Sequence, residues 1–186
     1  MKGLKISMLS LMLGLVCVSF AAAQQSQGNV EISFAYVKQG GTGSNQFAVW
    51  IEDASGRVVK TIYATRFTAR GGWKRRPESI PQWVEASGVK TMNKDQYDAL
   101  TASTPRQGTL TYVWDGTDQA GKPVAPGEYT VHVEGSLRFA NRVLYTGKVT
   151  LGGPAAELQA ASQYWGDSAA ERGMIGPVTL RYKPKG

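Results

Sequence analysis

The sequence predicts an all-β fold, an antiparallel immunoglobulin-like β-sandwich of about seven strands. Two observations support this prediction. Short segments in which every second residue is apolar recur along the chain, and a period of two is typical of half-buried strands. Residues that favour turns separate these segments, as they do in sandwich domains. The chain has 186 residues, of which 42% are hydrophobic, so it is long enough for one ordinary domain with a proper core.

The first three expected strands lie in the N-terminal third of the chain. Apolar alternation begins over 30–36, continues over 47–51 and returns over 57–65. The glycine-rich segment 39–44 predicts a loop between the first two strands. The turn residues Asp53–Gly56 predict a hairpin between the second and the third.

The second half of the chain predicts further strands, at 110–114, 129–134, 143–151 and 178–182. The irregular stretch 152–176 is expected to contain a short helix near 155–162. Residues 66–107 also lack alternation and predict an insertion of about forty residues, a length that often serves function. Asn93 with Gln96 is typical of a helix N-terminus with a capping box.

The N-terminal residues 1–23 are typical of a secretory signal peptide. Lys2 and Lys5 precede the uncharged apolar run Ile6–Phe20, and small residues follow up to Ala23. The apolar run is shorter than the roughly 20 residues that cross a bilayer, which favours a cleaved signal over a membrane anchor. We therefore expect cleavage near Ala23 and a periplasmic or secreted protein.

Cleavage would leave a short flexible leader, 24–28, ahead of a single domain, 29–186, that contains the insertion 66–107.

Cys17 is the one cysteine and would be lost with the signal peptide, so disulfides, thiol catalysis and cysteine-based metal sites are not expected. His132 is the one histidine, which excludes a multi-histidine metal centre. We expect no metal site.

The segment Trp114–Tyr129 is expected to be a hairpin connection between neighbouring strands. Asp115 and Asp118 can accept hydrogen bonds from turn amides, and the glycines and prolines between the two aromatic residues suit a tight connection. Calcium is an alternative use of two close aspartates, but their spacing lacks the alternating ligands of an EF-hand loop. Trp114 and Tyr129 are expected to face the core.

This segment resembles the hairpin of the immunoglobulin-like domain in flagellar hook-capping proteins, which implies a fold and nothing more. Other motifs extend the comparison: Asn45–Asp53, Thr65–Phe67, Gly71–Pro77, Pro81–Trp83 and Asn141–Gly147. Over residues 30–153 the chain is similar to a bacterial family of predicted periplasmic proteins, named domain of unknown function 2271. The resemblance implies a secreted sandwich domain with no assigned activity.

The insertion holds an unusual concentration of positive charge. Five basic residues fall within eleven positions that contain no acid: Arg66, Arg70, Lys74, Arg75 and Arg76. Without the two lysines of the signal peptide, the 21 basic residues become 19 against 14 acidic ones, so these five equal the whole excess. Such a cluster creates a local positive potential. Trp73 lies inside the cluster and Trp83 follows it.

Three interpretations of this cluster remain open. The arginines can form ordinary surface pairs with Glu78, Glu85 or aspartates elsewhere. They can form an anion site, because guanidinium groups bind carboxylate and phosphate in pairs of hydrogen bonds, and Trp73 can stack on a flat ring. Basic residues among aromatic ones also suit nucleic acid, but export argues against it. The five basic residues, Trp73 and Trp83 are therefore the candidate ligand-binding residues.

A second motif concerns a cofactor. The segment Asp98–Pro105 resembles the pattern of extracytoplasmic domains that carry flavin mononucleotide through a phosphoester to threonine, and by position Thr104 would be the acceptor. The segment departs from that pattern at Ala102, where glycine is usual, at Ser103 and at Pro105. The alternative is a serine- and threonine-rich exit from a short helix.

We expect a non-catalytic exported protein that binds an anionic small molecule or a membrane redox partner through the basic insertion. The alternatives are a flavin-carrying electron-transfer protein and a structural or adhesive module, since a fold does not fix function. No catalytic residue is singled out. His132 is expected to be exposed, on the opposite strand face from Val131 and Val133, and no Gly-x-Ser-x-Gly motif is present.

Overall fold

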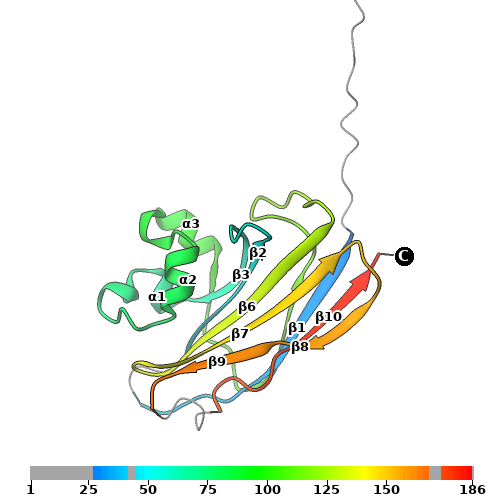
Figure 1. Ribbon diagram of the computed structural model, residues 1–186. Helices are drawn as coiled ribbons and strands as arrows, with labels where there is room; N and C mark the ends of the chain where they lie inside the picture. The colour runs from blue at the N-terminus through cyan, green and yellow to red at the C-terminus, as the bar shows by residue number, and fades with distance from the viewer. Residues whose placement is uncertain (1–26, 42–44, 168–172, 186) are drawn as a thin grey trace, which may run out of the picture.

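The computed structural model describes residues 27–41, 45–167 and 173–185, which form two β-sheets packed as a sandwich (Figure 1). The predicted β-sandwich is confirmed, whereas its immunoglobulin-like type stays a prediction. The four-stranded sheet has the order β5 (Gly108–Trp114), β1 (Gly28–Tyr36), β10 (Thr179–Pro184), β8 (Ala156–Gln159). All its neighbouring strands are antiparallel.

The six-stranded sheet has the order β4 (Thr101–Ala102), β3 (Val58–Thr65), β2 (Gln46–Asp53), β6 (Gly127–Arg138), β7 (Asn141–Leu151), β9 (Ala161–Trp165). Only the two-residue β4 pairs in the parallel direction, with β3. The insertion between β3 and β4 consists of short helices: α1 (Arg66–Ala69), η1 (Gly72–Lys74), α2 (Pro81–Ala86), η2 (Val89–Thr91) and α3 (Lys94–Ala99). The predicted capping box is present, with Asn93 as the N-cap of α3 and Gln96 as its partner.

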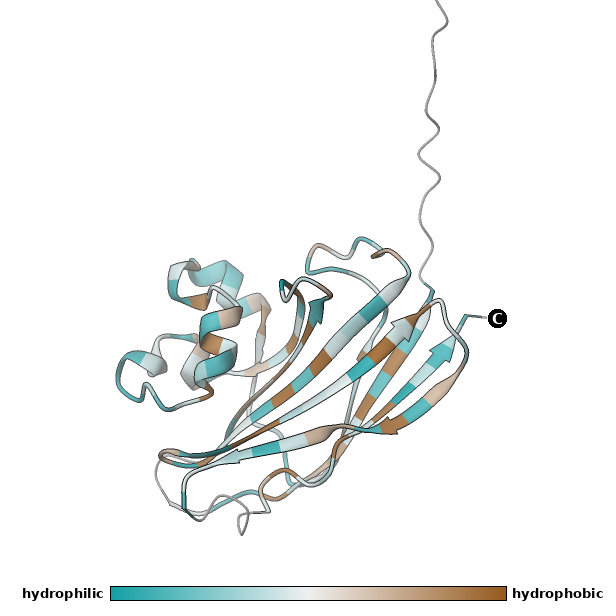
Figure 2. Cartoon of the chain, viewed as in Figure 1, coloured by the Kyte–Doolittle hydropathy of each residue, from teal (hydrophilic) through white to brown (hydrophobic). Residues whose placement is uncertain are grey.

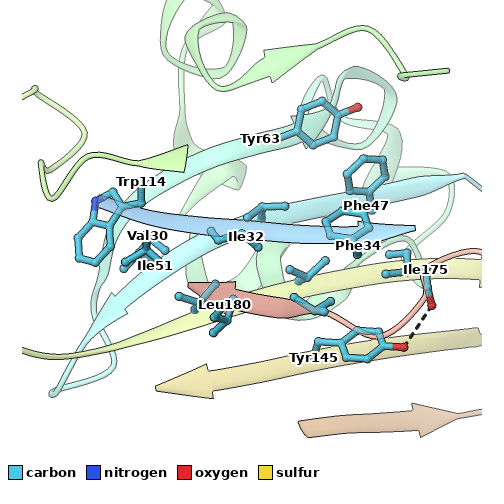
Figure 3. Packing of buried hydrophobic residues seen from close by; sticks show 14 of the residues in the cluster. Val30, Ile32, Phe34, Phe47, Ile51, Tyr63, Trp114, Tyr145, Ile175 and Leu180 are labelled. Carbon is cyan, nitrogen blue, oxygen red and sulfur yellow. Dashed lines mark hydrogen bonds between the residues drawn. The ribbon is translucent and has the colours of Figure 1, made fainter. Parts of the chain in front are cut away.

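The main core fills the space between the two sheets. Its residues come from alternate positions of the strands, so Val30, Ile32 and Phe34 of β1 are buried together (Figure 3). The same alternation appears as brown and paler bands along the strands in Figure 2. Phe47 stacks on Tyr63 with ring centroids 4.5 Å apart. Burial of these large side chains supplies most of the stabilising free energy of the sandwich.

A second core lies on the other face of the six-stranded sheet, where the helical insertion covers β2 and β3 (Figure 1). Ala48 and Trp50 point from β2 toward the helices, and Trp83 of α2 meets them there. Trp83 is fully buried, and its indole N–H donates to Thr61 Oγ1 over 3.2 Å. The insertion is therefore packed on the sandwich through a core of its own.

Buried polar groups of β6 fix where α2 begins. The carboxylate of Glu134 is fully buried and accepts the backbone N–H groups of Trp83, at 2.9 Å, and of Gln82, at 3.3 Å. Ser136 Oγ accepts the N–H of Ile80 over 2.9 Å. These first N–H groups of a helix have no partner within the helix, so β6 satisfies them. Burial raises the pKa of Glu134 to about 7, although the two N–H groups and Arg142 act in the opposite direction.

The segment Trp114–Tyr129 differs from the prediction. It does not join neighbouring strands, because β5 belongs to the four-stranded sheet and β6 to the six-stranded sheet, so it is a crossing between sheets. The local turn chemistry is as predicted: Asp115 Oδ1 accepts from Thr117 N–H, and Asp118 Oδ1 accepts from Ala120 N–H. Alternation identifies strands but not the sheet to which each belongs.

The prediction of a short helix near 155–162 is wrong. This stretch forms β8 and β9, which pair with β10 and β7 and are joined through Ala160. Alanine and glutamate favour helix locally, but the open edges of the two sheets provide hydrogen-bond partners along the whole segment.

Replacing Glu134 with glutamine tests how the buried carboxylate affects stability. Its ordinary pKa of 4.5 is raised to about 7 by folding. The folded state keeps a proton that the unfolded chain releases, so stability falls as pH rises between these values, by up to about 1.4 kcal/mol per pH unit. Glu134→Gln should remove this fall in urea unfolding between pH 4.5 and 7.

Glu85→Gln is the matched control, because Glu85 is an exposed carboxylate on α2, the helix whose first N–H groups Glu134 accepts, and its pKa is lowered. It should keep the downward slope. An unchanged slope in Glu134→Gln would contradict the role given to this carboxylate.

Candidate anion-binding site

The insertion presents the candidate cations around two aromatic rings. The first is Phe67 of α1, whose ring centroid lies 4.1 Å from the guanidinium carbon of Arg76 and 5.5 Å from that of Arg75. Guanidinium groups stack favourably on aromatic faces, which holds the two arginines near each other. Gly72 makes this arrangement possible, since an added Cβ would lie 2.3 Å from the Phe67 carbonyl oxygen and 2.5 Å from its ring.

The second ring is that of Trp73 in η1. Lys74 Nζ lies 5.3 Å and Lys90 Nζ 6.0 Å from its centroid. A pocket of about 390 Å³ opens beside this ring. Its lining residues are Trp73, Lys74, Pro77, Pro81, Val84, Glu85 and Lys90. This volume suits a small molecule, and the mixture of one aromatic ring, apolar walls and two ammonium groups suits an organic anion.

Part of the positive charge is paired. Arg70 binds Asp98, which also binds Lys94 over 2.8 Å. The hydrogen bond from Lys94 has the largest effect and that from Arg70 the next, and together they hold the pKa of Asp98 below its usual range. Lys90 binds Glu85.

Four candidate cations remain without such a partner. Within residues 27–41, 45–167 and 173–185, no ion pair is formed by Arg66, Lys74, Arg75 or Arg76. Three of these four side chains are exposed and Arg76 is half-buried. The surface of α1 and η1 is therefore positive in the folded protein.

Two sequence candidates lie outside this cluster. Trp83 is fully buried in the second core, where it packs between the insertion and the six-stranded sheet, so it is not available to a ligand at the surface. Thr104 is exposed in the segment after β4, and the neighbouring Ser103 carbonyl accepts the Tyr63 hydroxyl over 3.3 Å. Ala23 and the expected signal peptide lie outside the described residues.

His132 is not the exposed residue that was expected. Its side chain is only 12% exposed and stacks on Trp50, with ring centroids 4.8 Å apart. Its Nε2 lies 3.1 Å from Glu52 Oε2, while Glu52 Oε1 accepts the Trp50 indole N–H over 2.8 Å. Burial lowers the pKa of His132, against the opposing effect of Glu52. Cross-strand pairing of Trp50 with His132 creates this cluster, and only the strand register could have revealed it.

A larger pocket, of about 520 Å³, lies beside the turn between β2 and β3. Its charged groups are engaged: Arg57 binds Asp53, and Asp118 accepts the N–H groups of Ala120 and Lys122. The Trp73 pocket is smaller, but two ammonium groups lie at its ring. We therefore take the Trp73 pocket as the candidate site.

Fold and site together define a two-sheet sandwich whose outer face carries a basic, aromatic, helical insertion. The family model described as "Predicted periplasmic protein (DUF2271)" matches residues 27–167, so the chain belongs to this family. The family resemblance seen in the sequence is thereby confirmed, and with it the description as a predicted periplasmic protein. No curated protein matches the chain, and no solved structure matches it.

Among the helices that the structure describes, none is both long and apolar enough to cross a membrane.

Gly72→Ala tests the packing of Phe67. The new Cβ would overlap the Phe67 backbone and ring, so the ring must move or the turn must open. We expect a loss of about 1–3 kcal/mol in the free energy of unfolding, as for other overpacked sites. Gly40→Ala is the control, because nothing lies within 4 Å of its added Cβ. Equal melting temperatures for both variants would contradict the close approach of Gly72 to Phe67.

Proposed function

We propose that this protein is an exported, non-catalytic binding protein that holds a small organic anion with a flat ring in the Trp73 pocket. The observation that carries the proposal is the placement of two ammonium groups, those of Lys74 and Lys90, beside one tryptophan ring at the pocket. A flat ring would stack on Trp73, and the negative group would meet the ammonium groups.

The neighbouring charges favour an anion over a neutral ligand. Glu85 is the one acid that lines the pocket, and it is already bound to Lys90. Exposed pairs of this kind contribute little to stability, so an arriving anion can take over Lys90 at low cost. Arg75 and Arg76, which form no ion pair with another described residue, add to the positive potential that attracts the ligand.

A small molecule is preferred to a membrane redox partner because the site is concave. A pocket of about 390 Å³ can enclose most of the surface of a small ligand. The two arginines at Phe67, of which Arg75 is exposed and Arg76 half-buried, would suit an acidic protein surface, but only their charge supports an accessory role of that kind.

A covalent flavin carrier is the second candidate. The observation in its favour is that Thr104 is an exposed residue beyond the end of β4 at Ala102, where a modifying enzyme could approach it. The residues around it still depart from the pattern of such domains at Ala102, Ser103 and Pro105.

Flavin mononucleotide and riboflavin are matched probes for the binding proposal, because they share a flat ring and differ in the phosphate. We expect flavin mononucleotide to bind at least tenfold more tightly than riboflavin, with quenching of flavin fluorescence by Trp73. Trp73→Leu and Lys74→Gln should each weaken binding about tenfold, which corresponds to about 1.4 kcal/mol. Lys94→Gln, a lysine outside the pocket, is the control and should bind normally. Equal affinity for both probes would overturn the anion site.

Mass spectrometry of the exported protein separates the two candidates. A binding protein should yield an unmodified peptide across Thr104. A peptide heavier by one flavin mononucleotide less one water, absent from Thr104→Ala, would instead establish the carrier and displace the binding proposal.

A further inference from the structure

The strand β5 is an edge that lacks the usual protection against pairing. Among the described residues it pairs with β1 alone, and the register of that pairing has no bulge. Its seven residues, Gly108–Trp114, include no charged residue and no proline. The side chains of Thr109, Thr111 and Val113 are exposed, that of Val113 by 51%. Alternate residues of an edge strand turn N–H and C=O groups away from the sheet, which offers a template for another strand.

Two other edges of the sandwich, at β3 and at β8, carry protection that β5 lacks. At β3, Gln119 acts in place of a further strand: its N–H donates to the Val59 carbonyl over 3.0 Å, and its side-chain oxygen accepts the Thr61 N–H over 2.9 Å. At β8, Glu157 forms an ion pair with Arg181 of the neighbouring strand. Charges and blocking groups of this kind disfavour edge-to-edge association.

The sequence of β5 is complementary to itself in the antiparallel direction. A two-fold axis through Thr111 pairs every residue of the strand, since residues equally far from position 111 then lie opposite each other. Thr109 meets Val113 of the other copy, and Leu110 meets Tyr112. β-branched residues face one another on the outer side and large apolar residues on the inner side, and such cross-strand pairs are stabilising. No like charges meet.

We propose that two copies of this protein associate through β5, in antiparallel pairing about a two-fold axis at Thr111, which joins their four-stranded sheets into one sheet of eight. A closed two-fold pairing uses the edge of both copies and leaves none for further growth. One strand pair buries little area, so the dimer is weak and dissociates on dilution. The interface lies on the other sheet from the basic insertion, so this inference stands apart from the proposed function.

Cysteine cross-linking of the exported protein tests the register. In a Cys17→Ala background, Thr111→Cys places two thiols opposite each other across the axis, within reach of a disulfide. We expect a covalent dimer on a non-reducing gel. Ser162→Cys on β9, another uncharged edge strand, is the matched control and should remain monomeric. A dimer from Ser162→Cys with none from Thr111→Cys would overturn the proposal.

Light scattering across a dilution series tests the association itself. The wild-type protein should show a concentration-dependent dimer. Thr111→Lys would set two ammonium groups against each other at the axis and should raise the dissociation constant at least tenfold. Gln159→Lys, on the opposite edge strand β8, should leave the dissociation constant unchanged. The melting temperatures of the two lysine variants show whether each of them is folded. A wild-type monomer at all concentrations, or equal effects of the two lysines, would overturn the proposal.

Discussion

Burial of β2 on both faces is the constraint on which the rest of this structure depends. All six residues from Gln46 to Ile51 are buried. Phe47 and Val49 face the main core, while Ala48 and Trp50 face the helical insertion. A strand enclosed in this way has a nearly continuous apolar sequence and must be covered on both sides. The insertion is thus needed to keep Trp50 away from water.

The same constraint explains the buried polar groups beneath the candidate site. A helix that starts on an apolar sheet must find acceptors for its first N–H groups, and Glu134 and Ser136 of β6 supply them. Trp83 then fixes the helix from its apolar side. These hydrogen bonds and the burial of Trp83 together set the direction of α2, and with it the positions of Val84 and Glu85 in the wall of the Trp73 pocket.

Local features of the fold could be predicted from the sequence. Alternation identified β1, β2 and β6, and the capping box at Asn93 depends only on residues three apart. Features that depend on distant partners were missed. The crossing at Trp114–Tyr129 was taken for a hairpin, and β8 and β9 were missed because their strand pairing, not their composition, makes them strands.

The candidate site shows the same division. Clustering of Arg75, Arg76 and Trp73 is visible in the sequence, because these residues are neighbours along the chain. Lys90 was not selected, since only the fold returns η2 to the Trp73 ring. Trp83 was selected as a candidate ligand-binding residue, although it is a core residue, because the sequence does not indicate which face of a short helix is covered.

The two-sided sheet also has a consequence for how this protein can vary. The segment 66–107 lies between two strands like an insertion that could be deleted, yet it covers a core that includes residues of β2, β3 and β7. Its deletion would expose Trp50, Ala64 and Leu144 at once. Length changes are compatible with the exposed turn at Ala54–Gly56, where side chains contribute to neither core. The insertion and the sandwich are therefore one packing unit, and a change in one part must fit the other.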